Sequence, residues 1–69
     1  MKGNGYPTAA GMKILERIFE SGPTPLAPIN PRTYAHLDEN GYVVTTTLGG
    51  VVCVDLSGEG KYFMSGELP

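Results

Sequence analysis

The side chains that could carry out chemistry in this sequence are few and scattered. His36, Asp38 and Glu39 combine an imidazole with two carboxylates, which are common metal ligands. At steps of two and three residues on a helix, however, such side chains do not converge well on one ion. No second histidine supports them, and the single cysteine, Cys53, is far away in the sequence. We therefore expect a solvated helix face here, with no metal site and no cofactor.

Two other motifs predict structure rather than catalysis. Cys53 lies in a valine-rich stretch without a neighbour that would activate it, so it is expected to pack as a small apolar residue. Gly58-Glu59-Gly60 is too short for a phosphate-binding loop, which needs more glycines and a following Lys-Ser or Lys-Thr. These observations predict a protein that is not an enzyme.

Composition restricts the remaining classes of function. The chain has 69 residues, of which 41% are hydrophobic and 17% charged, and it suits one small domain. It has no apolar run near the roughly 20 residues that cross a membrane, and neither a secretory signal nor paired cysteines, which favours the cytoplasm. A net charge of −2 without any basic run gives no support to nucleic-acid binding. Because so short a chain builds a small core, a partner or a homodimer would be a common means of stabilisation.

The first half of the chain predicts two helices separated by a connector. Residues 1–7 form a flexible lead, and Thr8 can cap a helix whose apolar residues recur at three and four residue steps until Ser21-Gly22-Pro23. Three prolines between positions 23 and 29 then allow only a short proline-rich connector. Asn30 followed by Pro31 predicts the start of a second helix, which Gly41 ends.

Arg32 and His36 fall on the side of this second helix that faces away from its apolar residues. Arginine can pair bidentately with guanine, and histidine can bond a phosphate or a base, although two ordinary surface residues are an equally good interpretation. Lys61 and Lys13 would add phosphate contacts. The total is still fewer than the ~6 to 10 contacts of strong DNA binding, so a dimer would be needed.

Residues 42–56 are rich in valine and threonine and predict a β-hairpin around Leu48-Gly49-Gly50. A two-residue turn at Gly49-Gly50 would place on one face Val43, Thr45, Thr47, Val52, Val54 and Leu56. A three-residue loop from Leu48 to Gly50 would instead gather Tyr42, Val44, Thr46, Val52, Val54 and Leu56. We favour the three-residue loop, because it collects more apolar side chains on one face. Ser57 then caps a short C-terminal helix, and residues 65–69 form a tail.

Parts of this pattern resemble the winged helix-turn-helix family. The segment from Asn30 to Val43 resembles a recognition helix and its exit, in which a leucine four residues before a glycine precedes an apolar pair. The hairpin with Asp55-Leu56-Ser57-Gly58-Glu59-Gly60 resembles the wing and its closure in the MarR-like group. The chain is also similar to small single-domain winged-helix proteins of bacteriophages and actinobacteria.

The resemblance covers about half of the chain and implies an α+β, compact winged-helix-like domain over residues 8–64. The implied function is that of a small DNA-binding or transcription-regulating protein with duplex DNA as its partner. The residues implied for nucleic-acid binding are Asn30, Arg32, Thr33, His36 and Lys61.

Two departures from the family pattern favour a different function on the same scaffold. Only the proline-rich connector stands where a helix-turn-helix has its first helix, and the tip of the wing carries no positive charge. Together with the acidic balance, these features favour a protein-protein interaction module, for example a phage factor that binds a host protein. Both interpretations remain open at the level of sequence.

Overall fold

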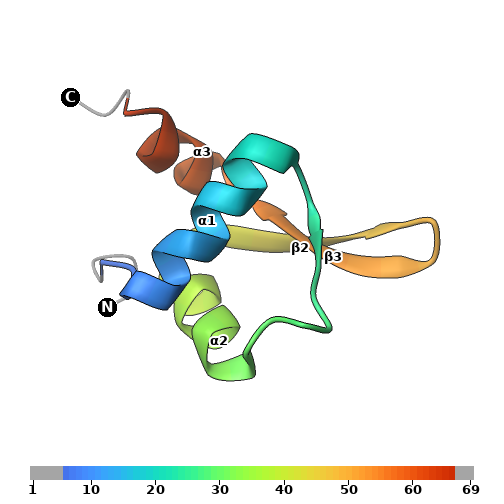
Figure 1. The fold of residues 1–69 in the computed structure, drawn as a ribbon. Coiled ribbons are helices and arrows are strands. Elements are labelled where there is room, and N and C mark those ends of the chain that lie inside the picture. Colours follow the sequence, from blue (N-terminus) through green and yellow to red (C-terminus); the bar gives the residue numbers. More distant parts are fainter. Residues whose placement is uncertain (1–5, 67–69) are drawn as a thin grey trace.

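The computed structural model describes residues 6–66; residues 1–5 and 67–69, with most of the predicted lead and tail, lie outside the described residues. Within residues 6–66, the element order is α1, β1, α2, β2, β3, α3, and the strands form one antiparallel sheet in the order β1-β3-β2 (Figure 1). This arrangement confirms the predicted α+β class and the winged-helix-like order of helix, helix, hairpin and helix.

Helix α1 (Ala9–Ser21) begins and ends as its sequence predicts. The Thr8 hydroxyl accepts a hydrogen bond from the amide of Gly11 at 3.1 Å, and Gly22 ends the helix with φ of 93°. Leu15 and Ile18 are buried on the inner face. The helix lies between the two others and packs against both (Figure 1).

The proline-rich connector contains a short strand that the sequence did not predict. Strand β1 (Thr24–Pro25) pairs with Val54 and Cys53 of β3, and the amide of Leu26 donates to the carbonyl of Val52 at 3.0 Å. A proline can stand on this outer strand because it needs no donated hydrogen bond there. Between β1 and α2 the described chain forms turns, so the first helix of a helix-turn-helix is absent from this segment.

Helix α2 (Pro31–Glu39) is held by its cap and by close contact with α1. Asn30 Oδ1 accepts from the amides of Arg32 at 2.9 Å and Thr33 at 3.4 Å, as the Asn-Pro start predicts. Leu37 is fully buried. A Cβ atom at Gly11 would lie 3.1 Å from the Leu37 side chain, which explains why a residue without a side chain occupies the contact between the two helices.

The register of the hairpin differs from the one that we favoured. Strands β2 (Val43–Leu48) and β3 (Val51–Leu56) pair from Leu48 opposite Val51, so Gly49 and Gly50 form a two-residue turn and the predicted three-residue loop is wrong. Both glycines have positive φ, 57° and 81°, as a type I′ turn requires. The twist of this turn matches that of the strands, and this local preference determines the register.

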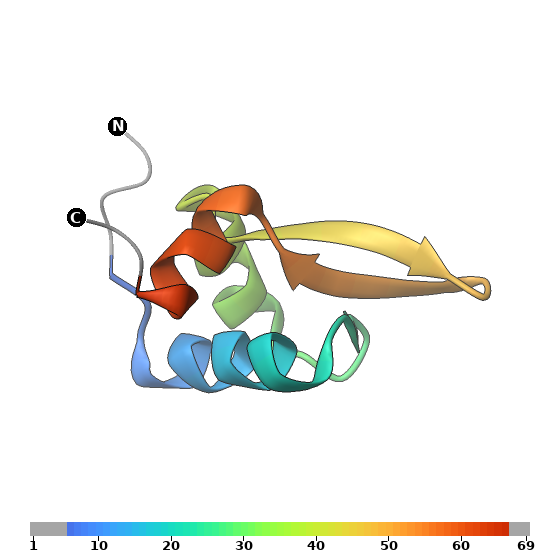
Figure 2. The same ribbon diagram turned by 90° about the horizontal axis from the view of Figure 1, so that it is seen from above.

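The favoured register failed because it assumed that the whole hairpin packs on the core. Only the base of the hairpin does so, with Val43, Val54 and Leu56 buried. The half next to the turn projects beyond the helices (Figure 2). Gathering apolar side chains on one face brings no benefit where no other element covers that face.

Helix α3 (Gly58–Ser65) is joined to the base of the hairpin by Ser57. The Ser57 hydroxyl accepts from the amide of Gly60 at 2.9 Å and donates to the carbonyl of Gly41 at 2.5 Å. The Ser57 amide donates to the carbonyl of Tyr42 at 3.0 Å. We call Gly41, Tyr42, Ser57 and Gly60 the Ser57 junction, because through them the end of α2, both strands and α3 meet.

The glycines of α3 provide a test of the Ser57 junction. A Cβ atom at Gly60 would collide with the carbonyl oxygen of Tyr42, whereas a Cβ at Gly58 would meet open space. We predict that Gly60→Ala lowers the free energy of unfolding by about 1–3 kcal/mol or more, because the strand base and α3 must separate. The matched Gly58→Ala variant should be neutral or more stable by up to about 1 kcal/mol, since alanine favours helix. Urea denaturation measures both, and equal effects of the two substitutions would contradict the close packing.

Candidate nucleic-acid interface

The structure brings together three of the five residues implied for nucleic-acid binding. Asn30, Arg32 and Thr33 lie at the first turn of α2. Arg32 is exposed, while Asn30 uses its Oδ1 atom to cap the helix and keeps its amide Nδ2 as a donor. Thr33 is half-buried. The start of α2 therefore offers one cation and two short polar side chains.

His36 does not share the exposed surface of Arg32. Its Nδ1 atom is buried without a hydrogen-bond partner among the described residues, and its Nε2 lies 3.5 Å from the side-chain amide of Asn40. His36 lies four residues after Arg32 and is half-buried, whereas Arg32 is exposed. The expected role of His36 in nucleic-acid binding stays a prediction.

Lys61 lies apart from the other implied residues. It is exposed on α3, and α1 separates α3 from α2 (Figure 1). A DNA duplex bound at the start of α2 would therefore not contact Lys61 of the same protein molecule.

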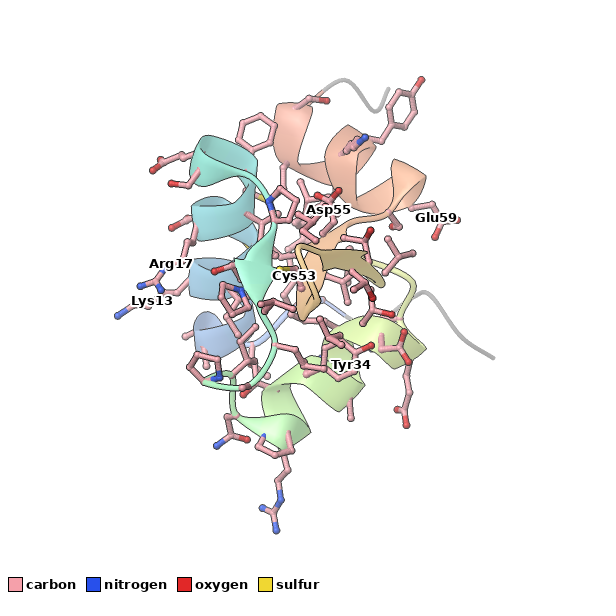
Figure 3. The ribbon with its side chains drawn as sticks, turned by 90° about the vertical axis from the view of Figure 1, so that its right-hand side faces the viewer. Lys13, Arg17, Tyr34, Cys53, Asp55 and Glu59 are labelled. Atoms are coloured by element: carbon pink, nitrogen blue, oxygen red, sulfur yellow. The ribbon has the colours of Figure 1, made fainter. Side chains whose placement is uncertain are left out.

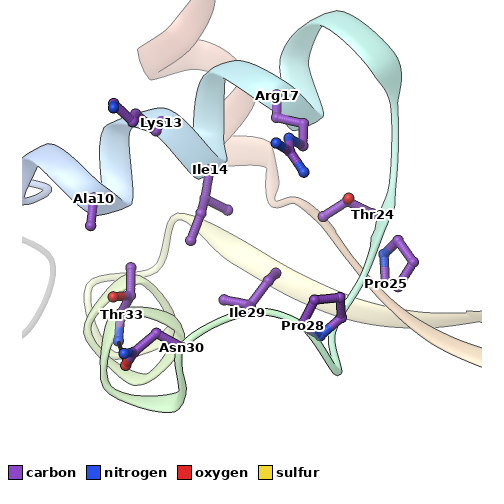
Figure 4. A pocket seen from close by; sticks show the side chains of 10 residues that line it. All are labelled: Ala10, Lys13, Ile14, Arg17, Thr24, Pro25, Pro28, Ile29, Asn30 and Thr33. Atoms are coloured by element: carbon purple, nitrogen blue, oxygen red, sulfur yellow. Dashed lines mark hydrogen bonds between the residues drawn. The ribbon is translucent and has the colours of Figure 1, made fainter.

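Two basic residues of α1, Lys13, which was expected to add a phosphate contact, and Arg17, lie near the first turn of α2. Lys13 and Arg17, one turn apart, point outward from α1, on the side of the molecule opposite Glu59 (Figure 3). Both line a cavity whose far wall includes Asn30 and Thr33 (Figure 4). The sequence shows that Lys13 and Arg17 lie one turn apart on the same helix, next to the apolar Ile14. It does not show that these two residues lie near the start of the second helix.

The cavity lies between α1, the segment around β1 and the first turn of α2, and it has a volume of about 310 Å³. We call it the α1–α2 cleft. Its lining includes Ile14, Arg17, Thr24, Ile29, Asn30 and Thr33. None of its lining residues is acidic.

The charges on α2 are divided along its length. Arg32 stands at the start, whereas Asp38 and Glu39 are exposed at the end. An anionic partner would therefore approach the first turn and avoid the last one. The positively charged surface of the molecule is the start of α2 together with Lys13 and Arg17.

The hairpin, which takes the place of the wing, has no charged side chain from Val43 to Val54. Three large apolar residues near its turn are about half exposed, Leu48 at 50%, Val51 at 49% and Val52 at 46%, and so is Val44 at the base of the hairpin, at 47%. A wing of this composition is suited to contact with protein rather than with phosphate.

Within residues 6–66, the groups that would carry other chemistry do not form a site. No set of three His, Cys, Asp or Glu side chains is placed to hold a metal, and no helix is long and apolar enough to cross a membrane. Cys53 is buried, and its thiol donates a weak hydrogen bond to the carbonyl of Val51 at 3.7 Å.

No family model, curated protein or solved structure matches this chain. Its fold and its site therefore define it only as a small winged-helix-like α+β domain with a basic helix start and an uncharged wing.

The buried phenol of Tyr42 makes folding sensitive to alkaline pH. Burial raises the pKa of Tyr42 above its ordinary value of 10.0, and negative charge on Tyr6 and Glu59 raises it further. Burial, followed by Asp38, raises the pKa of Tyr34 in the same direction. The folded chain thus keeps phenolic protons that the unfolded chain releases above pH 10, so stability is lost as the pH rises from there.

We predict that these two groups leave the free energy of unfolding in urea unchanged below pH 10 and lower it as the pH rises above 10. Tyr42→Phe should reduce this fall, because the substitution removes one titrating group. An identical alkaline loss in wild type and Tyr42→Phe would show that Tyr42 does not contribute.

Proposed function

We propose that this protein is a small cytoplasmic winged-helix DNA-binding protein that acts in transcription regulation. The observation that carries the proposal is the exposed Arg32 at the first turn of α2, a turn whose Asn30 and Thr33 line one cavity together with Lys13 and Arg17 of α1. In helix-turn-helix proteins, the first residues of the recognition helix read base edges. The start of α2 offers a guanidinium for bidentate pairing with guanine and polar side chains for the neighbouring backbone.

The number of cations sets the expected strength of binding. Three basic side chains near one helix end are fewer than the ~6 to 10 phosphate contacts of tight complexes. Two copies on adjacent half-sites would supply about six, so we propose that the protein binds specific DNA as a homodimer. Non-specific binding by one copy should be weak and confined to low salt.

Fluorescence anisotropy with a labelled mixed-sequence duplex at low salt tests this proposal. We expect the logarithm of the binding constant to fall with the logarithm of salt concentration with a slope of about −3 for a single copy, or about twice that for a dimer. Arg32→Ala should weaken binding. Lys61→Ala, which removes an exposed cation of α3 away from the proposed surface, is the matched control and should change it little.

Two results would contradict DNA binding through α2. One is the absence of any anisotropy change at the lowest salt concentration, where electrostatic attraction is strongest. The other is an equal loss of affinity in Arg32→Ala and Lys61→Ala, which would mean that binding follows net charge and not the start of α2.

A second candidate function is favoured by the hairpin. Its uncharged, half-exposed tip is the kind of surface that contacts another protein, and it lacks the cation that would reach DNA. The alternative proposal is therefore a protein-protein interaction module on the same scaffold, with a host protein or a second copy as the partner.

Sedimentation of wild type and of the double variant Leu48→Thr/Val51→Thr tests the hairpin as a contact between copies. Both side chains are about half exposed, so the variant should fold with little change in stability. If the hairpin joins two copies, wild type should self-associate with rising concentration and the variant should not. If neither chain self-associates, a second copy is excluded as the partner, and affinity capture with the same pair of proteins addresses a host protein.

A further inference from the structure

The α1–α2 cleft has apolar walls and is open to solvent at a basic rim. Ile14 of α1 and Ile29 before α2 face each other across it, and Pro25 and Pro28 close one side (Figure 4). Both isoleucines are half-buried and also contact the core, so the apolar surface is part of the folded domain and not a loose loop. At about 310 Å³ the cavity stands at the lower end of the range for small-molecule sites.

Two cations stand at the rim of this cavity. Arg17 is exposed and points outward from α1 (Figure 3), at the end of the cavity next to Thr24, whereas the ammonium group of Lys13 lies farther along the helix (Figure 4). Among residues 6–66, no ion pair to Arg17 is present. Since the lining contains no carboxylate, the charge of Arg17 has no counterpart in the cleft.

The other polar groups on the walls can all donate hydrogen bonds. Thr24 lies beside Arg17, while Asn30 and Thr33 stand at the opposite end (Figure 4). Asn30 has already committed its Oδ1 atom to the helix cap, so the group left to a ligand is its NH₂ donor. An apolar slot with a fork-shaped cation at one end and neutral donors at the other is complementary to a carboxylate that has an apolar body.

We propose that the α1–α2 cleft binds a small amphipathic carboxylic acid as its ligand. The carboxylate pairs with Arg17 next to the Thr24 hydroxyl, and the hydrocarbon part lies between Ile14 and Ile29. The size of the cavity limits the ligand to about ten non-hydrogen atoms, which excludes nucleotides and folded partners. This inference goes beyond DNA binding: the cleft shares Lys13 and Arg17 with the proposed DNA surface, whereas Arg32 lies outside its lining.

Titration of the ¹⁵N-labelled full chain with sodium hexanoate, followed by amide NMR spectra, tests the proposal. We expect saturable shifts centred on Ile14, Arg17, Thr24 and Ile29, with a dissociation constant on the order of 1 mM for so small a ligand. Hexan-1-ol has the same apolar body without the charge and should bind more weakly. Inorganic phosphate has charge without an apolar body and should not saturate these amides.

Matched variants separate the role of Arg17 from general positive charge. Arg17→Gln should raise the dissociation constant of hexanoate about tenfold, which corresponds to the loss of one charge-assisted pair. Arg17 is exposed, so this variant should keep the wild-type fold and spectrum. Lys13→Gln should have a smaller effect, and Arg32→Gln should leave hexanoate binding unchanged.

Four outcomes would overturn the proposal. These are the absence of saturable shifts, shifts centred outside the cleft, equal affinity for hexan-1-ol or phosphate, and an Arg17→Gln variant that binds hexanoate as wild type does. Because DNA is absent from the experiment, a negative result here leaves the function of Arg32 untouched, and a failure of DNA binding leaves the cleft untouched.

Discussion

The structure depends on one junction, at which Ser57 joins the base of the hairpin to two helices. Its hydroxyl bonds the carbonyl of Gly41 at the end of α2, its amide bonds the carbonyl of Tyr42, and the same hydroxyl caps α3. Gly60 then brings the α3 backbone so close to Tyr42 that no larger residue fits. Two of these three hydrogen bonds use the Ser57 hydroxyl, so one side chain joins the end of α2, the base of the hairpin and the start of α3. The buried Tyr42 ring and Phe63, whose centroids are 5.1 Å apart, fill the space directly inside the junction.

Because the hairpin is held only at its base, its outer half is left exposed. The buried residues extend along the strands from Val43 and Leu56 as far as Val54 and Cys53, and the hairpin beyond them projects past the helices. Residues there must then be selected for the turn and for what they contact outside the domain. A long edge strand with few charges is usually a liability, since it invites pairing with other chains. Its presence in this chain is physically reasonable if the exposed tip is itself a contact surface.

Sequence reasoning succeeded where structure is determined locally. Thr8, Asn30 and Ser57 were each predicted to cap a helix, and each accepts the expected amide, because a cap depends on residues only two or three positions away. Sequence reasoning failed where contacts between distant segments of the chain determine the structure. Strand β1 exists only because the connector passes beside β3, and the hairpin register follows the Gly49-Gly50 turn once the outer half has nothing to pack on.

The residues of the candidate site were likewise predictable only where they are neighbours in the sequence. The first turn of α2 was predictable as a unit, since Asn30, Arg32 and Thr33 are consecutive or nearly so. The contribution of Arg17 was not, because it depends on how α1 crosses α2, where Gly11 lies close to the Leu37 side chain. The crossing of α1 and α2 also determines where the basic residues of α1 lie. It brings Lys13 and Arg17 to the start of α2, where they strengthen the attraction of Arg32 for an anion. It also leaves Arg17 at the rim of the cleft and Arg32 outside its lining. One helix crossing thus sets the position of both groups on which the two proposals rest, an arginine in open solvent and an arginine beside isoleucine walls.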